Sequence, residues 1–302
     1  MNTPQLGIHQ RNYTLHEVAP YINWLYFFHA WGFAPKYATI ASIHGCDACR
    51  AQWLASFKEE ERAKAAEAMQ LWKEAQRMLN ALDADYKTHA VVLLTHCNSD
   101  GNDLLLHLED RDFRLPLLRQ QSGTPPFLCL SDFVRPMDKG DDIIGVFATT
   151  VSEEMEHCND ADEYKRLLTQ TLADRLAEAT AEILHQEVRK YLWGYAPNED
   201  LTHEQLCNEE FQGIRPAVGY PSLPDISINR LLNELIDMEN MGIHLTENAM
   251  MRPHASVSGL MLSHSESKYF LVGKIGNDQF EDYAKRRDMT MEEIKPFLLS
   301  NL

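Results

Sequence analysis

Residues 213 to 221 read Gly-Ile-Arg-Pro-Ala-Val-Gly-Tyr-Pro, with one charged side chain among residues that stiffen, bend or expose the backbone. The two prolines restrict φ, Gly219 can adopt φ > 0, and Ala217 leaves its main chain accessible. Arg215 adds a planar, permanently charged group suited to a carboxylate or phosphate, and Tyr220 adds a flat face with a hydroxyl. The stretch predicts a preformed loop for a small molecule. The alternative is a rigid turn whose arginine forms a salt bridge.

Helical periodicity surrounds this loop. The longest predicted helix runs from about Glu163 to Trp193, with Glu178 away from the centre of its apolar stripe. Other helices are predicted from about Phe57 to Leu82 and from Ser227 to Met241, the latter stopped by Gly242. Thr290 and Glu293 form a capping-box start for a last helix. The stripe predicted to be buried in the longest helix comprises Leu167, Leu168, Leu172, Leu176, Ile183, Leu184, Val188 and Leu192.

Short apolar runs between turn residues predict strands. Ala90 to Thr95 and Leu104 to Leu108 flank an Asp-Gly turn and predict a hairpin. We expect an α+β fold with a mainly antiparallel twisted sheet flanked by several helices, because strands and helices do not alternate regularly. The other predicted strands are Phe127 to Leu130 and Ile143 to Thr150, followed by a last hairpin of Val257 to Ser263 and Tyr269 to Ile275 around Ser265-Glu266.

Composition predicts one compact unit over residues 1–302, with an aromatic and helical part over about 1–86 and a core over about 87–302. The 302 residues are 44% hydrophobic, and the aromatic segment from Tyr21 to Trp31 is expected to be buried. Without a long apolar run or a signal-peptide pattern, we expect a cytoplasmic protein and no membrane partner. A formal charge of −17 argues against nucleic-acid binding.

Six cysteines are scattered along the chain, and we expect reduced thiols. Only Cys46-Asp47-Ala48-Cys49, with His44 two residues before it, has spacing typical of zinc ligands or of a redox pair. Because no second pair offers a fourth ligand, this possibility ranks last among the functions considered, and no metal ligand is assigned.

Several chemistries lack their motifs. The sequence contains neither a Gly-x-Gly-x-x-Gly nor a P-loop pattern. It also has no nucleophile elbow. Among thirteen histidines, His29 and His264 are retained as candidates for a functional role.

Three stretches resemble the activation domain of cobalamin-dependent methionine synthase. The first is the Arg-Pro-Ala-x-Gly-Tyr-Pro loop that begins at Arg215. The second is residues 173–198, with the exit Trp-Gly-Tyr-Ala-Pro-Asn, and the third is residues 255–286, with Ser-Lys-Tyr. The order of elements is similar from about Tyr21 to Leu302.

The resemblance implies a site for S-adenosylmethionine (AdoMet) whose residues come from four segments. One of these departs from the family, because Asn23 stands in Tyr-Ile-Asn-Trp where the family has an aspartate. A carboxylate there would add about 1.5 to 3 kcal/mol of charge-assisted attraction for a cationic ligand. AdoMet affinity is therefore expected to be lower, and Tyr26 stands where the family often has proline. The implied AdoMet-binding residues are Arg215, Ala217, Gly219, Tyr220, Tyr269, Phe270, Glu178 and Asn23.

The function implied by resemblance is reactivation of methionine synthase by reductive methylation of cob(II)alamin, with AdoMet as methyl donor. Cobalamin would be held by a partner, either a methionine synthase chain or another corrinoid protein, because this chain lacks the Asp-x-His-x-x-Gly pattern by which methionine-synthase-type domains ligate it. The resemblance makes the cobalt the nucleophile, so we expect no protein nucleophile and no general base. The chain is expected to act in trans. Flavodoxin is a possible electron donor, and the basic residues considered for its docking are Arg189, Lys190, Arg286 and Arg287. The alternative is a module that docks on a corrinoid protein without donating methyl.

Overall fold

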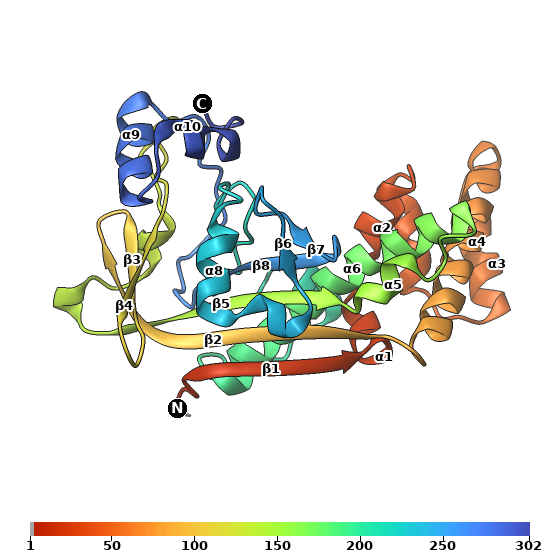
Figure 1. The fold of residues 1–302 in the computed structure, drawn as a ribbon. Coiled ribbons are helices and arrows are strands. Elements are labelled where there is room, and N and C mark those ends of the chain that lie inside the picture. Colours follow the sequence, from red (N-terminus) through yellow and green to blue (C-terminus); the bar gives the residue numbers. More distant parts are fainter. Residues whose placement is uncertain (1–2) are drawn as a thin grey trace.

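The computed structural model describes residues 3–302 and is built around a six-stranded sheet (Figure 1). Its order is β4-β3-β2-β5-β8, and β1 also pairs with β2. The long strand β2 pairs with β5 along one edge. Along its other edge β2 pairs first with β1, over residues 87–94, and then with β3, over residues 96–100. All of these pairs are antiparallel, which confirms the predicted sheet type. The strands are β1 Gly7–Thr14, β2 Lys87–Asp100, β3 Asp103–His107, β4 Asp112–Pro116, β5 Asp142–Val151 and β8 Ser256–Met261, and a separate small sheet pairs β6 His244–Leu245 with β7 Met251–Arg252.

Helices cover both faces of this sheet. The long helix α6 contacts β2, β5 and β8 on one face, and α8 contacts the same strands on the other. Alternate side chains of β2 therefore enter different cores: Val92 and Leu94 join α6, whereas Val91 and Leu93 join α8. The helices are α1 Leu15–Val18, α2 Trp24–Ala30, α3 Asp47–Ala55, α4 Glu59–Leu82, α5 Glu153–His157, α6 Glu163–Glu187, α7 His203–Cys207, α8 Ile228–Ile236, α9 Asn277–Arg286 and α10 Met291–Ile294.

The predicted helices are confirmed with small changes. Helix α4 ends at Leu82 as expected, and α6 continues into a π-helical turn over Val188–Leu192. Leu167 is wrongly placed in the buried stripe, since its side chain is 50% exposed. The helix that was predicted to reach Met241 ends at Ile236, and a 3₁₀ turn then leads to Gly242 with φ 80°. The capping box before α10 is confirmed.

Among the predicted strands, the β2–β3 hairpin and β5 are confirmed. Phe127 to Leu130 is wrong as a strand, because the chain turns into a 3₁₀ helix over Leu130–Phe133. Asp132 accepts a hydrogen bond from the Cys129 N–H at 2.9 Å and closes that turn. Strand β1 is not predicted, because its side chains alternate between partly buried and exposed and make no apolar run.

The last predicted hairpin is also wrong. Strand β8 exists, but residues 269–275 form no strand beside it. The free edge of β8 bonds instead to the loop 213–221: Ile214 exchanges both backbone hydrogen bonds with Leu262, at 2.9 and 3.0 Å. The segment after residue 268 crosses to the far end of that loop, where the Val272 N–H donates to the Pro221 carbonyl at 3.0 Å. The loop thus takes the place of the missing strand.

The aromatic segment near the N-terminus is only partly buried, which corrects the expectation. Ile22, Phe27 and Phe28 are fully enclosed, but Leu25 and Tyr26 are 40% and 57% exposed. Within residues 3–302, no helix has the length and apolar character needed to cross a membrane.

Candidate functional site

The loop 213–221 lies flat against β8 because one strand residue has no side chain. A Cβ at Gly259 would lie 2.2 Å from the Pro216 carbonyl oxygen and 2.9 Å from the Ala217 Cα. Gly213 and Gly219 have φ of 88° and 86°, which confirms that the loop uses the left-handed region at Gly219. Backbone bonds then fix the loop, for example from the Val218 N–H to the Ser258 carbonyl at 2.9 Å.

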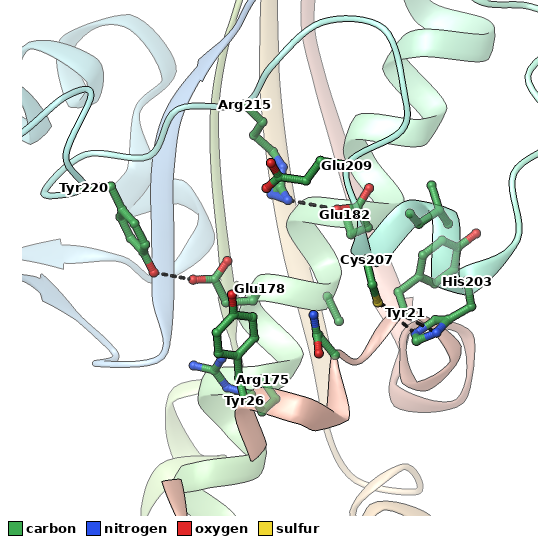
Figure 2. A pocket seen from close by; sticks show the side chains of 13 residues that line it. Tyr21, Tyr26, Arg175, Glu178, Glu182, His203, Cys207, Glu209, Arg215 and Tyr220 are labelled. Carbon is green, nitrogen blue, oxygen red and sulfur yellow. Dashed lines mark hydrogen bonds and ion pairs between the residues drawn. The ribbon is translucent and has the colours of Figure 1, made fainter. Parts of the chain in front are cut away.

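Beside the loop lies a cavity of about 290 Å³, between α6, α7 and the segment that leads into α2 (Figure 2). Asn23, Glu178, Arg215 and Tyr220 all line it, although they are far apart in the sequence. The structure therefore brings four of the expected site residues to one place.

A second cavity, of about 470 Å³, adjoins the first across the loop. Ala217, Tyr269 and Phe270 line it together with Arg215 and Tyr220. The two cavities fall near or within the range of about 300 to 1,000 Å³ that small-molecule sites occupy. Gly219 lines neither of them, and its N–H donates to the Leu223 carbonyl at 2.8 Å, so its part is to shape the turn.

Arg215 and Glu182 form an ion pair at the junction of the cavities. One guanidinium nitrogen of Arg215 lies 3.0 Å from Glu182 Oε2, and each side chain is 14% exposed. Burial opposes the charge on Arg215, but the carboxylate of Glu182 leaves its pKa above the usual value. Arg215 Nε and Glu182 Oε1 are buried without a hydrogen-bond partner. Such groups carry a desolvation cost that a polar ligand could remove.

Three carboxylates face the smaller cavity, from Glu178, Glu182 and Glu209. Glu178 accepts a hydrogen bond from the Tyr220 hydroxyl at 2.8 Å, and burial together with this carboxylate raises the pKa of Tyr220. Partial burial raises the pKa of Glu209. Because Arg175 and Arg215 line the same cavity, it presents charges of both signs.

Tyr269 connects the second cavity to Arg215. Its hydroxyl accepts a hydrogen bond from the Arg215 backbone N–H at 3.0 Å, and burial raises its pKa. The neighbouring Phe270 is held by backbone bonds to the Ser222 hydroxyl, at 2.5 and 2.9 Å. The Tyr269 ring and the backbone of Phe270 are thereby held at the cavity.

Asn23 begins helix α2 as its N-cap. Its Oδ1 accepts a hydrogen bond from the Leu25 N–H at 3.1 Å, which satisfies one free donor of the helix. With Oδ1 in this role, the Nδ2 donor is the part of the amide left for the cavity. An aspartate could cap the helix with one oxygen and face the cavity with the other.

Sequence reasoning missed several lining residues. Glu182 follows Glu178 by four residues, so it lies on the same face of α6, and that spacing was the signal available. Tyr26 lines both cavities. Its position in the sequence was notable only because the family often has proline there, and Tyr26 was not predicted as a site residue. Other missed residues of the smaller cavity, among them Arg175, His203, Cys207 and Glu209, have no local sequence signal.

The two retained histidines lie outside these cavities. His29 is exposed on α2, and His264 Nδ1 accepts a hydrogen bond from the Glu266 N–H at 3.1 Å. Neither residue lines the cavities described above.

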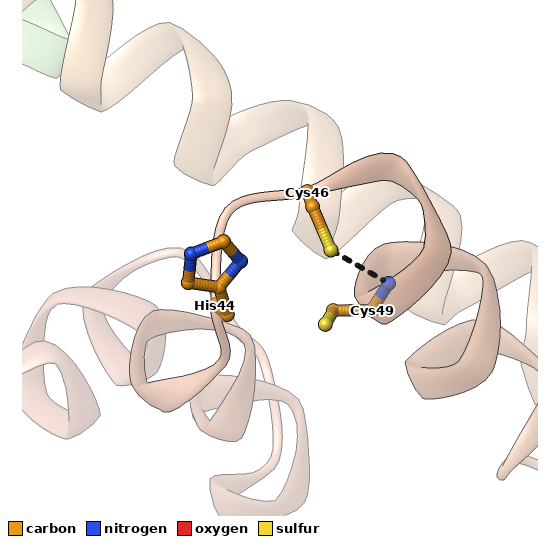
Figure 3. Close-up of side chains that lie close together, drawn as sticks. All are labelled: His44, Cys46 and Cys49. Carbon is orange, nitrogen blue, oxygen red and sulfur yellow. Dashed lines mark hydrogen bonds between the residues drawn. The ribbon is translucent and has the colours of Figure 1, made fainter.

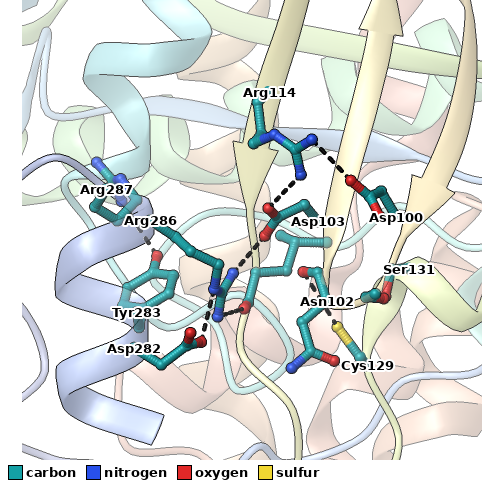
Figure 4. A network of polar contacts seen from close by, with 12 residues as sticks. Asp100, Asn102, Asp103, Arg114, Cys129, Ser131, Asp282, Tyr283, Arg286 and Arg287 are labelled. Atoms are coloured by element: carbon teal, nitrogen blue, oxygen red, sulfur yellow. Dashed lines mark hydrogen bonds and ion pairs between the residues drawn. The ribbon is translucent and has the colours of Figure 1, made fainter.

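The basic residues considered for docking do not form an exposed patch. Arg189 has no exposed side-chain surface and makes two bonds of 2.7 Å with Glu199. Arg286 binds Asp103 and Asp282 (Figure 4). Arg287 binds the buried Asp225. These charges are used to join elements of the fold, and Lys190 is the one member of the four without an ion pair among residues 3–302.

Comparison with known proteins identifies the family. The sequence model described as "Vitamin B12 dependent methionine synthase, activation domain" matches residues 14–288. The crystal structure of the MetH reactivation domain bound to AdoHcy is 38% identical in sequence to this chain and superposes with a TM-score of 0.87, and the match covers 100% of this chain and 93% of that chain. The chain belongs to the family of vitamin B12-dependent methionine synthase activation domains. The α+β architecture that the resemblance implied is thereby confirmed.

Proposed function

We propose that the chain binds AdoMet in the two adjoining cavities and presents its methyl group for reductive methylation of cob(II)alamin held by a methionine synthase partner. The solved MetH reactivation domain, which has the same fold, is bound to AdoHcy. Family membership, the cavities and their charges support this proposal together.

The observation that carries the proposal is the incomplete ion pair of Arg215 and Glu182. Both side chains line the smaller cavity, and each has one buried polar atom without a hydrogen-bond partner. AdoMet carries a carboxylate, an ammonium and a sulfonium, so it can pair with both. A ligand of one charge sign would leave one of these protein groups unmatched.

The side chains that line the two cavities can be assigned to different parts of AdoMet. Arg215 binds the carboxylate through its planar donors, and Glu178 and Glu182 attract the cationic end. Tyr220, Tyr269 and Phe270 supply flat surfaces for the adenine, and the backbone around Ala217 supplies polar contacts. Gly219 acts indirectly by holding the turn, and Asn23 contributes an amide donor. The acids of α6 also supply negative charge that the amide at position 23 cannot.

The chemistry requires orientation more than acid–base catalysis. Bound AdoMet supplies the methyl group, and an electron donor such as flavodoxin supplies the one electron that reduction of the cobalt requires. The chain fixes the direction of the methyl group, and it holds the carboxylate and ammonium of the ligand away from that group. No side chain is assigned a nucleophilic role.

Calorimetric titration with AdoMet tests the site. We expect R215A to bind roughly 10- to 150-fold more weakly, because a charge-assisted hydrogen bond contributes about 1.5 to 3 kcal/mol. R62A is the matched control, since Arg62 pairs with Glu59 on the exposed face of α4. Equal affinities of R215A and the parent chain would contradict the assigned site.

The docking alternative predicts a different response to N23D. If the chain has lost AdoMet binding through Asn23, restoring the carboxylate should produce binding where none existed. Because Glu178, Glu182 and Glu209 already supply negative charge, we expect measurable binding in the parent chain and a gain of roughly tenfold or less in N23D. No binding by the parent chain and strong binding by N23D would favour the docking module.

Action in trans is the final part of the proposal. The purified chain is added to a separate cob(II)alamin-loaded methionine synthase fragment with AdoMet and a reductant, and methylcobalamin is followed by absorbance. We expect formation that depends on the chain's concentration and is lost in R215A. Methylation that is no faster with the chain than without it would contradict action in trans while leaving AdoMet binding intact.

A further inference from the structure

A cluster of metal-ligating side chains lies away from the cavities, between the 3₁₀ helix Pro35–Ser42 and α3. The ligand atoms of His44, Cys46 and Cys49 all lie within 4.8 Å of one another (Figure 3). Within residues 3–302 this is the one such group of three. We propose that these three side chains bind a single Zn²⁺-class cation, with both cysteines as thiolates.

The donor set selects the cation. Two thiolates and an imidazole are soft and borderline ligands, which favour zinc over Mg²⁺ or Ca²⁺, whose sites are built from oxygen. Ligands around a tetrahedral zinc lie roughly 3.3 to 3.8 Å apart, given Zn–S and Zn–N distances of about 2.3 and 2.0 Å. A pair of ligand atoms at the 4.8 Å limit therefore needs to come closer by about 1.0 to 1.5 Å.

The segment is held in place on both sides of the cluster. The Trp53 indole N–H, on α3, donates to the Thr39 hydroxyl at 2.9 Å, and Trp53 packs edge-on against Phe57 at 4.8 Å between ring centroids. The Cys49 N–H donates to Cys46 Sγ at 3.3 Å, which orients that sulfur. Because the three ligands lie within six residues and their helix is anchored, binding has little chain entropy to overcome.

Exposure leaves room for entry and for a fourth ligand. His44 is exposed, and both cysteines are half-buried. Three protein ligands leave one coordination position for water or an added ligand, as in zinc sites that exchange a ligand. Two thiolates balance the charge of the divalent ion, and the formal charge of −17 on the chain attracts cations to it.

A disulfide between Cys46 and Cys49 is the competing use of the same pair. A disulfide would need neither His44 nor an open coordination position. The structure nevertheless places the His44 imidazole within 4.8 Å of both sulfur atoms. The segment that precedes the cluster also lines a third cavity with Asn23 and His203. A bound cation would therefore stiffen a wall close to the ligand site without taking part in it.

The test uses the full chain, reduced and kept without oxygen, titrated with Co²⁺ as a probe for zinc. We expect one equivalent to bind with sulfur-to-cobalt charge-transfer absorption, and one equivalent of Zn²⁺ to displace it. C46S and C49S should each weaken binding by more than roughly 100-fold, because loss of a direct ligand exceeds the effect of an outer partner. C158S is the matched control, since Cys158 is exposed elsewhere and should bind as the parent does.

Two outcomes would overturn the proposal. One is the absence of charge-transfer absorption in the reduced parent chain while circular dichroism shows it to be folded. The other is retention of full binding in H44A together with air oxidation that removes the Cys46 and Cys49 thiols, since that result indicates a redox pair. Because Arg215 and its cavity are not involved, AdoMet titration of the same variants separates this result from the proposed function.

Discussion

Two buried ion pairs in this molecule differ in how completely the protein satisfies them. In the pair of Arg287 and Asp225, the side chains are 3% and 1% exposed, and both carboxylate oxygens accept hydrogen bonds, including those from Ser227 and Tyr283. In the pair of Arg215 and Glu182, Glu182 Oε1 accepts no hydrogen bond, although a guanidinium nitrogen of Arg189 lies 3.8 Å from it. Nε has no hydrogen-bond partner in either Arg215 or Arg287, so the two pairs differ at the carboxylate. The first pair is closed and joins α9 to the core, whereas the second is open and borders a cavity. The unfilled carboxylate oxygen of Glu182 and the adjoining cavity, more than the hydrogen bonds of the arginine itself, distinguish the second pair from the first.

The largest expected effect concerns the closed pair. D225A removes the carboxylate and leaves the Arg287 charge buried, so we expect the free energy of unfolding to fall by about 3–5 kcal/mol. Chemical denaturation measures the change. E182Q is the comparison, because Glu182 borders a cavity, and its loss should be less than half as large. Equal losses in the two variants would break the distinction between closed and open pairs.

A smaller effect is expected from lysine at the two arginines. R215K keeps the charge but loses the planar fork, so AdoMet affinity should fall roughly tenfold with little change in unfolding free energy. R287K should do the reverse, with lower stability and unchanged affinity. Calorimetry and thermal unfolding on both variants separate these effects. A loss of affinity in R287K comparable with that in R215K would show that the two regions are coupled.

The smallest expected effect is a pH dependence at Glu209. Because partial burial raises its pKa, this carboxyl gains a proton where an exposed glutamate has lost it. A cationic ligand favours the charged form, so AdoMet affinity should fall roughly two- to fivefold as pH falls through the raised pKa. The free energy of unfolding changes in the opposite direction. The contribution of Glu209 to stability is fully present below the usual glutamate pKa, and it is lost as pH rises through the raised pKa of the folded state. Calorimetry over this pH range should show no such dependence in E209Q.

Sequence reasoning predicted the loop and the long helices well because their signals are local. Proline, glycine and apolar periodicity determine backbone shape within a few residues, and Gly219 and α6 follow them. The pairing of the loop with β8 was not predictable in this way, since it depends on the absence of a Cβ at Gly259. The last hairpin failed for the same reason: residues 269–275 are apolar, but another segment already occupies the strand edge they would need.

The candidate site was predicted in part. The resemblance brought attention to Arg215, Tyr269 and Asn23, and the structure places each of them at a cavity. Glu182 and Tyr26 were missed because their importance arises where α6 and α2 meet the loop in space. Conversely, three of the four basic residues considered for docking are already paired within the fold, because charge counted along a chain does not reveal which charges have partners.

The contact between Gly259 and the loop limits how this protein can vary. Every other residue type would place an atom where the Pro216 carbonyl already lies, and that carbonyl belongs to the wall of the candidate site. Position 259 can therefore change only if the loop changes with it. In a large collection of random variants, Gly259 should stay invariant among folded, ligand-binding chains, even though it contributes no chemical group to the ligand.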